Sequence, residues 1–487
     1  MSEQDPRIDR RKVLKGLGAS ATVTTFAGCT GGGDGGGTPT EGDGGGSTPT
    51  EGDGGGGTTG TPGDSGEWPD LSGQEVHLLT DETSDPFRNL FDRLGADFAD
   101  ATGAEVRNEY AGTGSSIEER VAQLVQAGDP PEILFTSGGQ AARFAQEDLL
   151  ASVTEVIEHW EEQWGDLSER YRVQVDGEDV HLPVSSKGYA FWYRDDISGF
   201  SDVPDSWSDL DAGWSEWLDA ASQAEGEQGL NGTYLPRGQG ACPEIWHWGQ
   251  AWSNGANICG RRDGEVVIVM DQGDNVDRWV EKLEFDKQLH QYSPPATDSG
   301  CGTMTQAVPS QVSASSHYII SRPKVQAVQR DTGFADAVRG TAPPMGKGEV
   351  HSGNSEGFVA FDTENSEAGV EWMKFLNQLD YQFPLYEITP FQIQPIFPDV
   401  KETDRWSDFV EGLDSAWTEQ DMAAAQHDQY QIAPNETDPP NPFTGNLLSA
   451  QHVTAMVFEV TINGKDPETA VMDTAEELRS ILQDVKG

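Results

Sequence analysis

One segment combines three tryptophans, Trp246, Trp248 and Trp252, with the acid Glu244. Tryptophan has a flat apolar face with one polar edge, and the C–H face of a sugar ring can stack on it. Trp248 and Trp252 are four residues apart and would share one face of a helix, so we expect them to pack in a core. Trp246 and Glu244 remain candidates for contact with a ligand.

Short polar segments follow three apolar runs in the first third of the folded part. Their side chains are small or acidic, and each segment leads toward an expected helix whose first backbone amides are free to donate. We predict that they bind a polar ligand through Thr80, Asp81, Glu82, Ser115, Ser116, Thr136, Ser137 and Gly138.

The elements that would position these segments alternate between strand and helix. Apolar runs predict strands at 76–79, 105–110 and 133–135, and helical spacing predicts helices at 87–102, 117–127 and from 140 onward. This β-α-β-α-β-α order predicts an α/β fold with a parallel sheet and helices on both faces. Ligands of such sheets bind beyond the carboxyl ends of the strands, where the polar segments lie.

An enzyme is the alternative from another functional class. Residues 353–357 read Gly-Asn-Ser-Glu-Gly, which matches the G-x-S-x-G pattern of hydrolases. In those enzymes the serine follows a strand and precedes a helix, whereas here the apolar run 358–361 comes after Ser355. His452 completes a triad only by assumption, and no carboxylate pair stands out for glycoside hydrolysis. The sequence therefore favours a binding protein over an enzyme.

The first 67 residues are read as targeting and tether. Arg10 and Arg11 precede a short apolar run, which resembles a twin-arginine export signal over residues 1–28. The run ends at Cys29 in a pattern that resembles a lipoprotein lipobox, so we expect Cys29 to carry a lipid. Residues 29–67 are rich in Gly, Thr, Pro and acids, a composition that predicts a disordered linker.

Charge and cysteine content limit the ligand classes and the covalent cross-links that the chain can have. The chain has 31 basic and 83 acidic residues, a net charge of −52, which excludes nucleic-acid binding through phosphate contacts. An evenly acidic surface favours a protein adapted to high salt over one that binds a cationic ligand. Beyond Cys29, one disulfide among Cys242, Cys259 and Cys301 is expected, and the pairing stays open. We predict no metal site, no cofactor and no membrane span after the signal.

Several blocks, taken together, resemble the family 1 extracellular solute-binding proteins, here of a halophilic archaeal type. The blocks are 131–135 with 149–150, 187–196, 341–344 with 355–361, 365–379, and 464–470. Glu132 stands where the family has aspartate, and Arg194 stands where it has asparagine. The resemblance implies a monomeric, lipid-anchored protein on the outer face of the cell membrane. It would capture a sugar or oligosaccharide for the permease subunits of an ABC importer, or alternatively a polyol, a glycerol phosphate or another small organic solute.

The same resemblance implies a two-lobed, periplasmic-binding-protein-like fold, each lobe a mainly parallel sheet flanked by helices. The chain would cross the hinge three times, near 185–186, 354–355 and 389–395. The N-terminal lobe would hold residues 68–185 plus 355–394, and the C-terminal lobe 186–354 plus 395–487. The resemblance places Glu244, Trp246, Ser315, Ser316 and Asn354 at the cleft, with Tyr318 offering a further hydroxyl.

Overall fold

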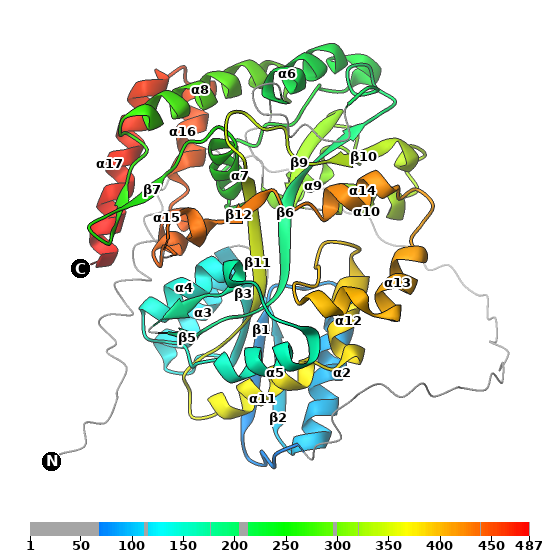
Figure 1. Ribbon diagram of the computed structural model, residues 1–487, viewed down its shortest axis with the longest axis vertical. Coiled ribbons are helices and arrows are strands. Elements are labelled where there is room, and N and C mark those ends of the chain that lie inside the picture. Colours follow the sequence, from blue (N-terminus) through cyan, green and yellow to red (C-terminus); the bar gives the residue numbers. More distant parts are fainter. Residues whose placement is uncertain are drawn as a thin grey trace, which may run out of the picture.

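The computed structural model describes residues 68–111, 115–175, 177–203, 213–295, 300–319, 321–438 and 440–486. The predicted signal, Cys29 and the linker lie outside these residues. Figure 1 shows two groups of elements, one above the other. We call the group that holds β1, β2 and β3 the lower lobe, and the group that holds β9 and β10 the upper lobe.

A single mixed sheet runs through both lobes. Its order is β10-β6-β11-β3-β1-β2, with β9 also paired to β6 and β12 to β11. The strands are β1 (Glu75–Thr80), β2 (Glu105–Tyr110), β3 (Ile133–Ser137), β6 (Leu182–Arg194), β9 (Ser315–Ile319), β10 (Val338–Thr341), β11 (His351–Ala360) and β12 (Tyr430–Ile432). Strand β1 is parallel to both β2 and β3, as the β-α-β pattern predicts.

Helices cover both faces of the lower part of the sheet. Because side chains alternate along a strand, Leu78 and Leu79 of β1 point to opposite faces and belong to two separate cores. The core on Leu78's side is covered by α2 (Asp85–Thr102), α5 (Thr154–Trp164), α11 (Ser366–Leu376) and α12 (Leu379–Ile388). The core on Leu79's side is covered by α3 (Ser115–Ala127) and α4 (Gly138–Gln146). Along the chain, three short elements follow α5 and precede β6: η1 (Glu169–Tyr171), β4 (Gln174–Val175) and β5 (Glu178–Asp179).

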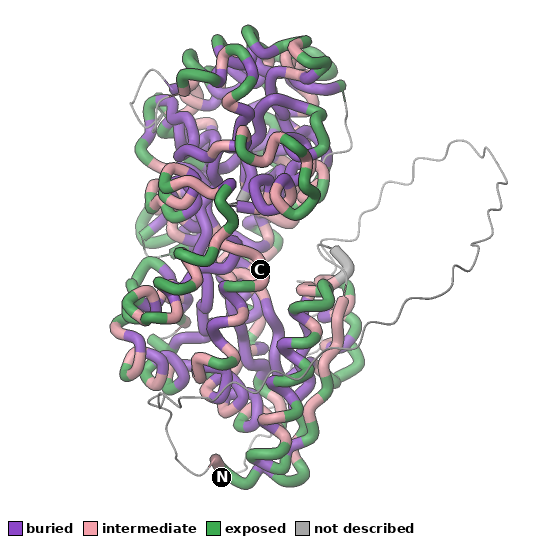
Figure 2. Tube along the Cα trace, turned by 90° about the vertical axis from the view of Figure 1, so that its right-hand side faces the viewer, coloured by how far each residue is buried: buried purple, intermediate pink, exposed green. Residues whose placement is uncertain are grey.

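The upper lobe differs from the predicted parallel sheet. Strands β9 and β10 both pair antiparallel to β6, because one long strand forms the centre of this part of the sheet. The surrounding helices are α6 (Gly213–Ala224), α7 (Ala241–Trp252), α8 (Asp274–Leu289), α9 (Cys301–Gln306), α10 (Arg322–Gln329), α14 (Glu419–Ala425), α15 (Thr444–Ser449), α16 (His452–Thr461) and α17 (Pro467–Lys486). A hairpin of β7 (Cys259–Arg262) and β8 (Glu265–Ile268) lies beside α17. Figure 2 shows buried chain inside each lobe and exposed residues mainly on the outer elements.

Strands β6 and β11 carry the chain between the lobes as an antiparallel pair (Figure 1), with Ser186 opposite Ser355. The chain crosses between the lobes for the third time at a later point in the sequence than the predicted 389–395. Phe397, Val400 and Trp406 are buried in the lower-lobe core, so η5 (Pro398–Glu402) and α13 (Asp404–Glu411) belong to that lobe. The chain then passes to α14, which packs on β10. The predicted start of the last upper-lobe segment at 395 therefore moves to about 412–418, because apolar packing, not the prolines, sets the boundary.

Candidate functional site

The two faces of the β6–β11 pair carry different side chains. Lys187 of β6 is opposite Asn354 of β11, and Ser186 is opposite Ser355. Because residues two apart along a strand share a face, Lys187, Asn354 and Glu356 lie on one face, which we call the front face. Ser186, Gly188 and Ser355 lie on the other, the back face. The front face is strongly polar, although both strands are largely buried.

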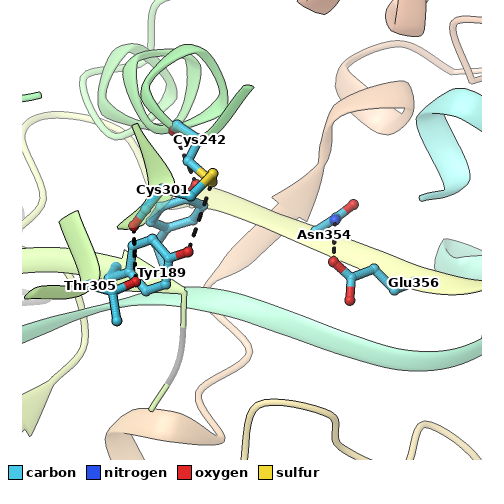
Figure 3. The surroundings of a disulfide bond; sticks show 7 residues. Tyr189, Cys242, Cys301, Thr305, Asn354 and Glu356 are labelled. Atoms are coloured by element: carbon cyan, nitrogen blue, oxygen red, sulfur yellow. Dashed lines mark hydrogen bonds between the residues drawn. A yellow bond between two sulfur atoms is a disulfide. The ribbon is translucent and has the colours of Figure 1, made fainter. Parts of the chain in front are cut away.

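An ion pair occupies the centre of the front face. The side chain of Lys187 is only 4% exposed, and its ammonium donates to the carboxylate of Glu356. Asn354 donates from Nδ2 to Glu356 Oε1 at 3.2 Å, and Figure 3 shows the two side chains pointing toward one another. The pair forms because strand pairing brings together two residues far apart in the sequence. A ligand here would meet a fixed ammonium, an amide and a carboxylate.

Two acids reach this face from the lower lobe, at the carboxyl end of β1. Burial raises the pKa of Asp81 to about 7, and the neighbouring charges of Glu356 and Glu82 add to the effect, while Lys187 opposes it. Burial also raises the pKa of Glu82, against the pull of Arg322. Three acids therefore share one partly desolvated region with two bases. Near neutral pH the Asp81 carboxyl can donate as well as accept a hydrogen bond.

The upper lobe contributes Arg322, the first residue of α10. Its Nε donates to Gln392 Oε1 at 2.7 Å. Burial lowers the pKa of the guanidinium, but Tyr318, Glu82 and Glu356 outweigh burial and raise it above its ordinary value. The charges of Arg322 and Glu82 thus act on each other from opposite lobes. We define the interlobe polar cluster as Asp81, Glu82, Lys187, Arg322, Asn354 and Glu356.

Tyr189 and a disulfide lie beside the interlobe polar cluster (Figure 3). Tyr189, two residues beyond Lys187 on the front face, donates from its hydroxyl to the Cys242 carbonyl at 3.2 Å. Cys242 is bonded to Cys301, which joins the first turns of α7 and α9. The pairing that the sequence left open is therefore Cys242–Cys301. Cys259 is a buried free thiol that accepts a hydrogen bond from Asn441.

Some of the predicted site residues lie in or next to the interlobe polar cluster. Asp81, Glu82 and Asn354 belong to the interlobe polar cluster. Ser137 is opposite Glu356 across the β3–β11 ladder, and its hydroxyl accepts from the Gln140 amide at 3.4 Å, so it caps α4. Thr136 is the preceding residue of β3 and is half-buried.

The other four residues predicted to contact a ligand in this part of the chain have different outcomes. Thr80 is fully buried and accepts from the Glu82 amide at 3.1 Å. Gly138 is buried on the back side, since an added Cβ would lie 2.8 Å from the Ser355 hydroxyl. Both residues therefore position the loop and helix rather than face the cluster. Ser115 and Ser116 begin α3, and their side chains lie outside what the structure describes.

Glu244 and Trp246 need correction. Glu244 is fully buried, and its carboxylate accepts from Trp248 Nε1 at 3.0 Å, from the amides of Val453 and Thr454 at 3.2 and 2.7 Å, and from the Thr454 hydroxyl at 2.7 Å. It holds the start of α16. Trp246 is fully buried, with its ring 5.5 Å from that of His317. The phase of α7 turns both side chains into the upper lobe. Trp248 and Trp252 are in the core, as predicted.

Ser315 and Ser316 also need correction. Both are fully buried in β9, and their hydroxyls donate to the backbone carbonyls of Gly232 at 3.0 Å and Met304 at 3.3 Å. These bonds tie β9 to its neighbours inside the upper lobe. Tyr318, on the same strand, packs edge-on against Tyr189 with ring centroids 6.4 Å apart.

Sequence reasoning missed Lys187, Glu356 and Arg322 as site residues. A signal for the first was available, because Lys187 is the one charge within the apolar and small residues 182–193, where an unpaired ammonium would be costly. Arg322 stands directly before Pro323 at a helix start, which by itself identifies no function. Their convergence depends on strand register, which the sequence does not specify.

The hydrolase alternative finds no support in the geometry. Ser355 lies in the middle of β11, is 1% exposed, and its hydroxyl has no hydrogen-bond partner among the described residues. The Nδ1 atom of His452 is 2.8 Å from a carboxylate oxygen of Glu477, in α17. No group of three or more His, Cys, Asp or Glu side chains suited to a metal occurs in the part of the chain that the structure describes. Across the same residues, no helix combines the length and apolar character that a membrane crossing requires.

The sequence pattern of the family described as bacterial extracellular solute-binding proteins matches residues 80–382. No curated protein sequence matches the chain. Among solved structures, a solute-binding protein of an ABC transporter from Thermotoga lettingae TMO, bound with alpha-D-tagatose, has a TM-score of 0.67 at 15% identity, covering 84% of this chain and 100% of that one. Maltose-bound MalE3 of T. maritima has a TM-score of 0.67 at 15% identity, covering 84% and 99%. A sugar transporter protein from Arthrobacter chlorophenolicus A6 with bound laminaribiose has a TM-score of 0.66 at 15% identity, covering 85% and 99%. At these identities the likeness is one of fold.

Proposed function

The chain belongs to the family of bacterial extracellular solute-binding proteins, and from that premise we propose that it captures a sugar between its two lobes for an ABC importer. The observation that carries this proposal is the interlobe polar cluster. Its charged and amide groups come from the lower lobe, the upper lobe and the two connecting strands.

A sugar fits the chemistry of the cluster better than an apolar solute. Each hydroxyl of a sugar can donate and accept, and carboxylates, an ammonium and a guanidinium supply both kinds of partner. The rings of Tyr189 and Tyr318 pack against each other beside the polar groups with almost no exposed surface, so the polar groups carry the proposed recognition. The similar structures bound to tagatose, maltose and laminaribiose support the same class of ligand. A polyol shares these groups and is the second candidate.

Capture by closure follows from the position of the cluster. A solute that contacts both lobes stabilises the arrangement in which they are close, so it shifts the population toward that arrangement. Strands β6 and β11 and the stretch near 412–418 are the connections that such a hinge motion would bend. The importer's permease subunits would then recognise the closed form, and no covalent step is required.

The proposed location is the outer face of the cell membrane. The signal at 1–28 and the lipobox pattern at Cys29 support twin-arginine export followed by lipid attachment. A Cys29→Ser variant should be released into the medium with unchanged solute affinity. Retention of that variant on the membrane would contradict the anchor.

A thermal-shift screen of sugars and polyols, followed by calorimetry, tests the function. A ligand at 100 times its Kd should stabilise the protein by about 2.7 kcal/mol. Asn354→Ala should weaken the binding of that ligand at least tenfold, because the amide lies on the front face. The matched control is Asn463→Ala, because this exposed side chain donates to Glu459 at 2.9 Å and lies outside the interlobe polar cluster. Saturable binding of amino acids or metal ions, with none of sugars or polyols, would contradict the proposal.

A further inference from the structure

A cavity of about 470 Å³ lies on the back face of the β6–β11 pair. Ser186 and Gly188 form part of its wall, whereas Lys187 between them points to the opposite face. Arg170 of η1 and Lys401 of η5 line the cavity from the lower lobe. His427, shortly before β12, and Tyr430, the first residue of β12, line it from the other side. The volume is sufficient for a small ligand and is separate from the interlobe polar cluster.

The wall is built by a connected set of hydroxyl groups. Ser186 donates to the Tyr171 hydroxyl at 3.1 Å, and the hydroxyls of Tyr171 and Tyr430 are 3.1 Å apart. Arg170 donates to the same Tyr171 hydroxyl, and its guanidinium lies 4.6 Å from the Tyr171 ring centroid and 5.3 Å from that of Tyr430. One guanidinium is thus held between two aromatic rings at the cavity wall.

Lys401 is unusual among the lysines of this acidic chain. The other eight lysines in the described ranges each have a carboxylate oxygen within 4.0 Å, as expected where acids outnumber bases. No described carboxylate lies that close to Lys401, although the exposed acids Glu402 and Asp428 also line the cavity. Burial, and next the charge of Arg170, lower the pKa of the Lys401 ammonium. Two neighbouring cations therefore face one cavity, and Lys401 has no anionic partner there among the described residues.

We propose that the back cavity binds a small oxyanion, a carboxylate or a phosphate, between Lys401 and Arg170. The anion supplies the partner that Lys401 lacks, and the guanidinium offers further N–H donors beyond the one bonded to Tyr171. Both cations belong to the lower lobe, and the rest of the wall comes from β6 and from the stretch 426–430. The site does not depend on a sugar binding at the front face.

Calorimetric titration of the full chain with inorganic phosphate, sulfate and acetate, at one ionic strength set with KCl, tests this site. We expect saturable binding of at least one of the three anions, one per chain, and the preferred anion separates phosphate from carboxylate chemistry. Lys401→Gln should weaken it about tenfold or more, the effect of losing a charged hydrogen bond, and Lys401→Arg should restore most of it. The matched control Lys465→Gln, which breaks a partly exposed pair with Asp473, should leave it unchanged.

The front face is the alternative location for such an anion. Arg322→Gln should leave anion binding unchanged, and Lys401→Gln should leave sugar binding intact, so failure here is distinguishable from failure of the proposed function. The melting temperature of each variant shows that it is folded. Absence of saturable binding for all three anions, or binding that Arg322→Gln abolishes and folded Lys401→Gln does not, would overturn the proposal.

Discussion

A Cβ added to Gly445 would lie 2.8 Å from the carbonyl oxygen of Gly139, so α15 of the upper lobe and α4 of the lower lobe meet through their backbones. Gln140 of α4 reinforces this contact by donating from Nε2 to Ser449 at 3.4 Å. The lobes therefore touch at one side of the hinge as well as being joined by strands.

Gly445→Ala should weaken solute binding, because its methyl group would hold the two helices apart and oppose closure. We expect a loss of about tenfold in affinity by calorimetry, with little change in the melting temperature of the free protein. Gly302→Ala in α9 is the control, since a Cβ there meets nothing within 4 Å. Equal affinities for the two variants would show that the α4–α15 contact is not used in closure.

Asp81→Asn should change the pH dependence of stability. The folded pKa of Asp81 is about 7, above its unfolded value near 4, so the native state binds more protons between these values and this group's contribution falls as pH rises. Relative to the wild type, the ligand-free variant should be more stable at pH 8 than at pH 5, by on the order of 2 kcal/mol. Denaturant titrations of the variant and the wild type at each pH measure the difference in their free energies of unfolding. The titration of the buried histidines affects both proteins equally and cancels in this difference.

The control for this experiment is Asp484→Asn, at an exposed position of α17. Its stability difference from the wild type should be the same at both pH values. A pH-independent difference for Asp81→Asn as well would show that Asp81 is not desolvated.

Glu244→Ala should destabilise the protein by about 3 kcal/mol, because it leaves the buried amides of Val453 and Thr454 without their acceptor. Solute affinity in the folded variant should be unchanged. The exposed Glu468, in the first turn of α17, provides the control Glu468→Ala. Loss of solute affinity at an unchanged melting temperature would instead show that Glu244 contacts the solute.

Removing the disulfide should lower stability without preventing binding. Cys242 and Cys301 are 59 residues apart, and a bridge over such a loop contributes about 2–4 kcal/mol, largely by restricting the unfolded chain. The double variant Cys242→Ser with Cys301→Ser should therefore melt earlier than Cys259→Ser. Indistinguishable melting of wild type under reducing and oxidising conditions would mean that the bond adds nothing.

Salt should stabilise the protein. With a net charge of −52, repulsion among the acids is long-ranged in dilute buffer, and at 1 M salt the Debye length falls to about 3 Å. The melting temperature should rise with KCl up to molar concentration. Melting that is independent of KCl would contradict adaptation to high salt.

The sequence was informative wherever a local pattern sets the structure. The apolar run 76–79 and the β-α-β-α-β-α order predict the parallel strands, and the polar residues after the first strand include Asp81 and Glu82 of the interlobe polar cluster. The rest depends on contacts that composition does not encode. Glu244 is predicted in the cleft but is buried, because its carboxylate accepts from the amides of Val453 and Thr454. These partners are about 210 residues away in the sequence, so no local pattern reveals this role. Lys187 meets Glu356 only through the register of β6 and β11.

The pairing of strands β6 and β11 determines how the protein unfolds. Each supplies pairing to both lobes, so melting either lobe would strip hydrogen-bond partners from the sheet of the other. Neither lobe is a contiguous length of chain, and a cut between them would sever the strands that complete both. Heat should therefore unfold the two lobes as one cooperative unit, with a calorimetric enthalpy equal to the van't Hoff value. A molecule whose halves must rotate against each other is, in thermodynamic terms, a single domain.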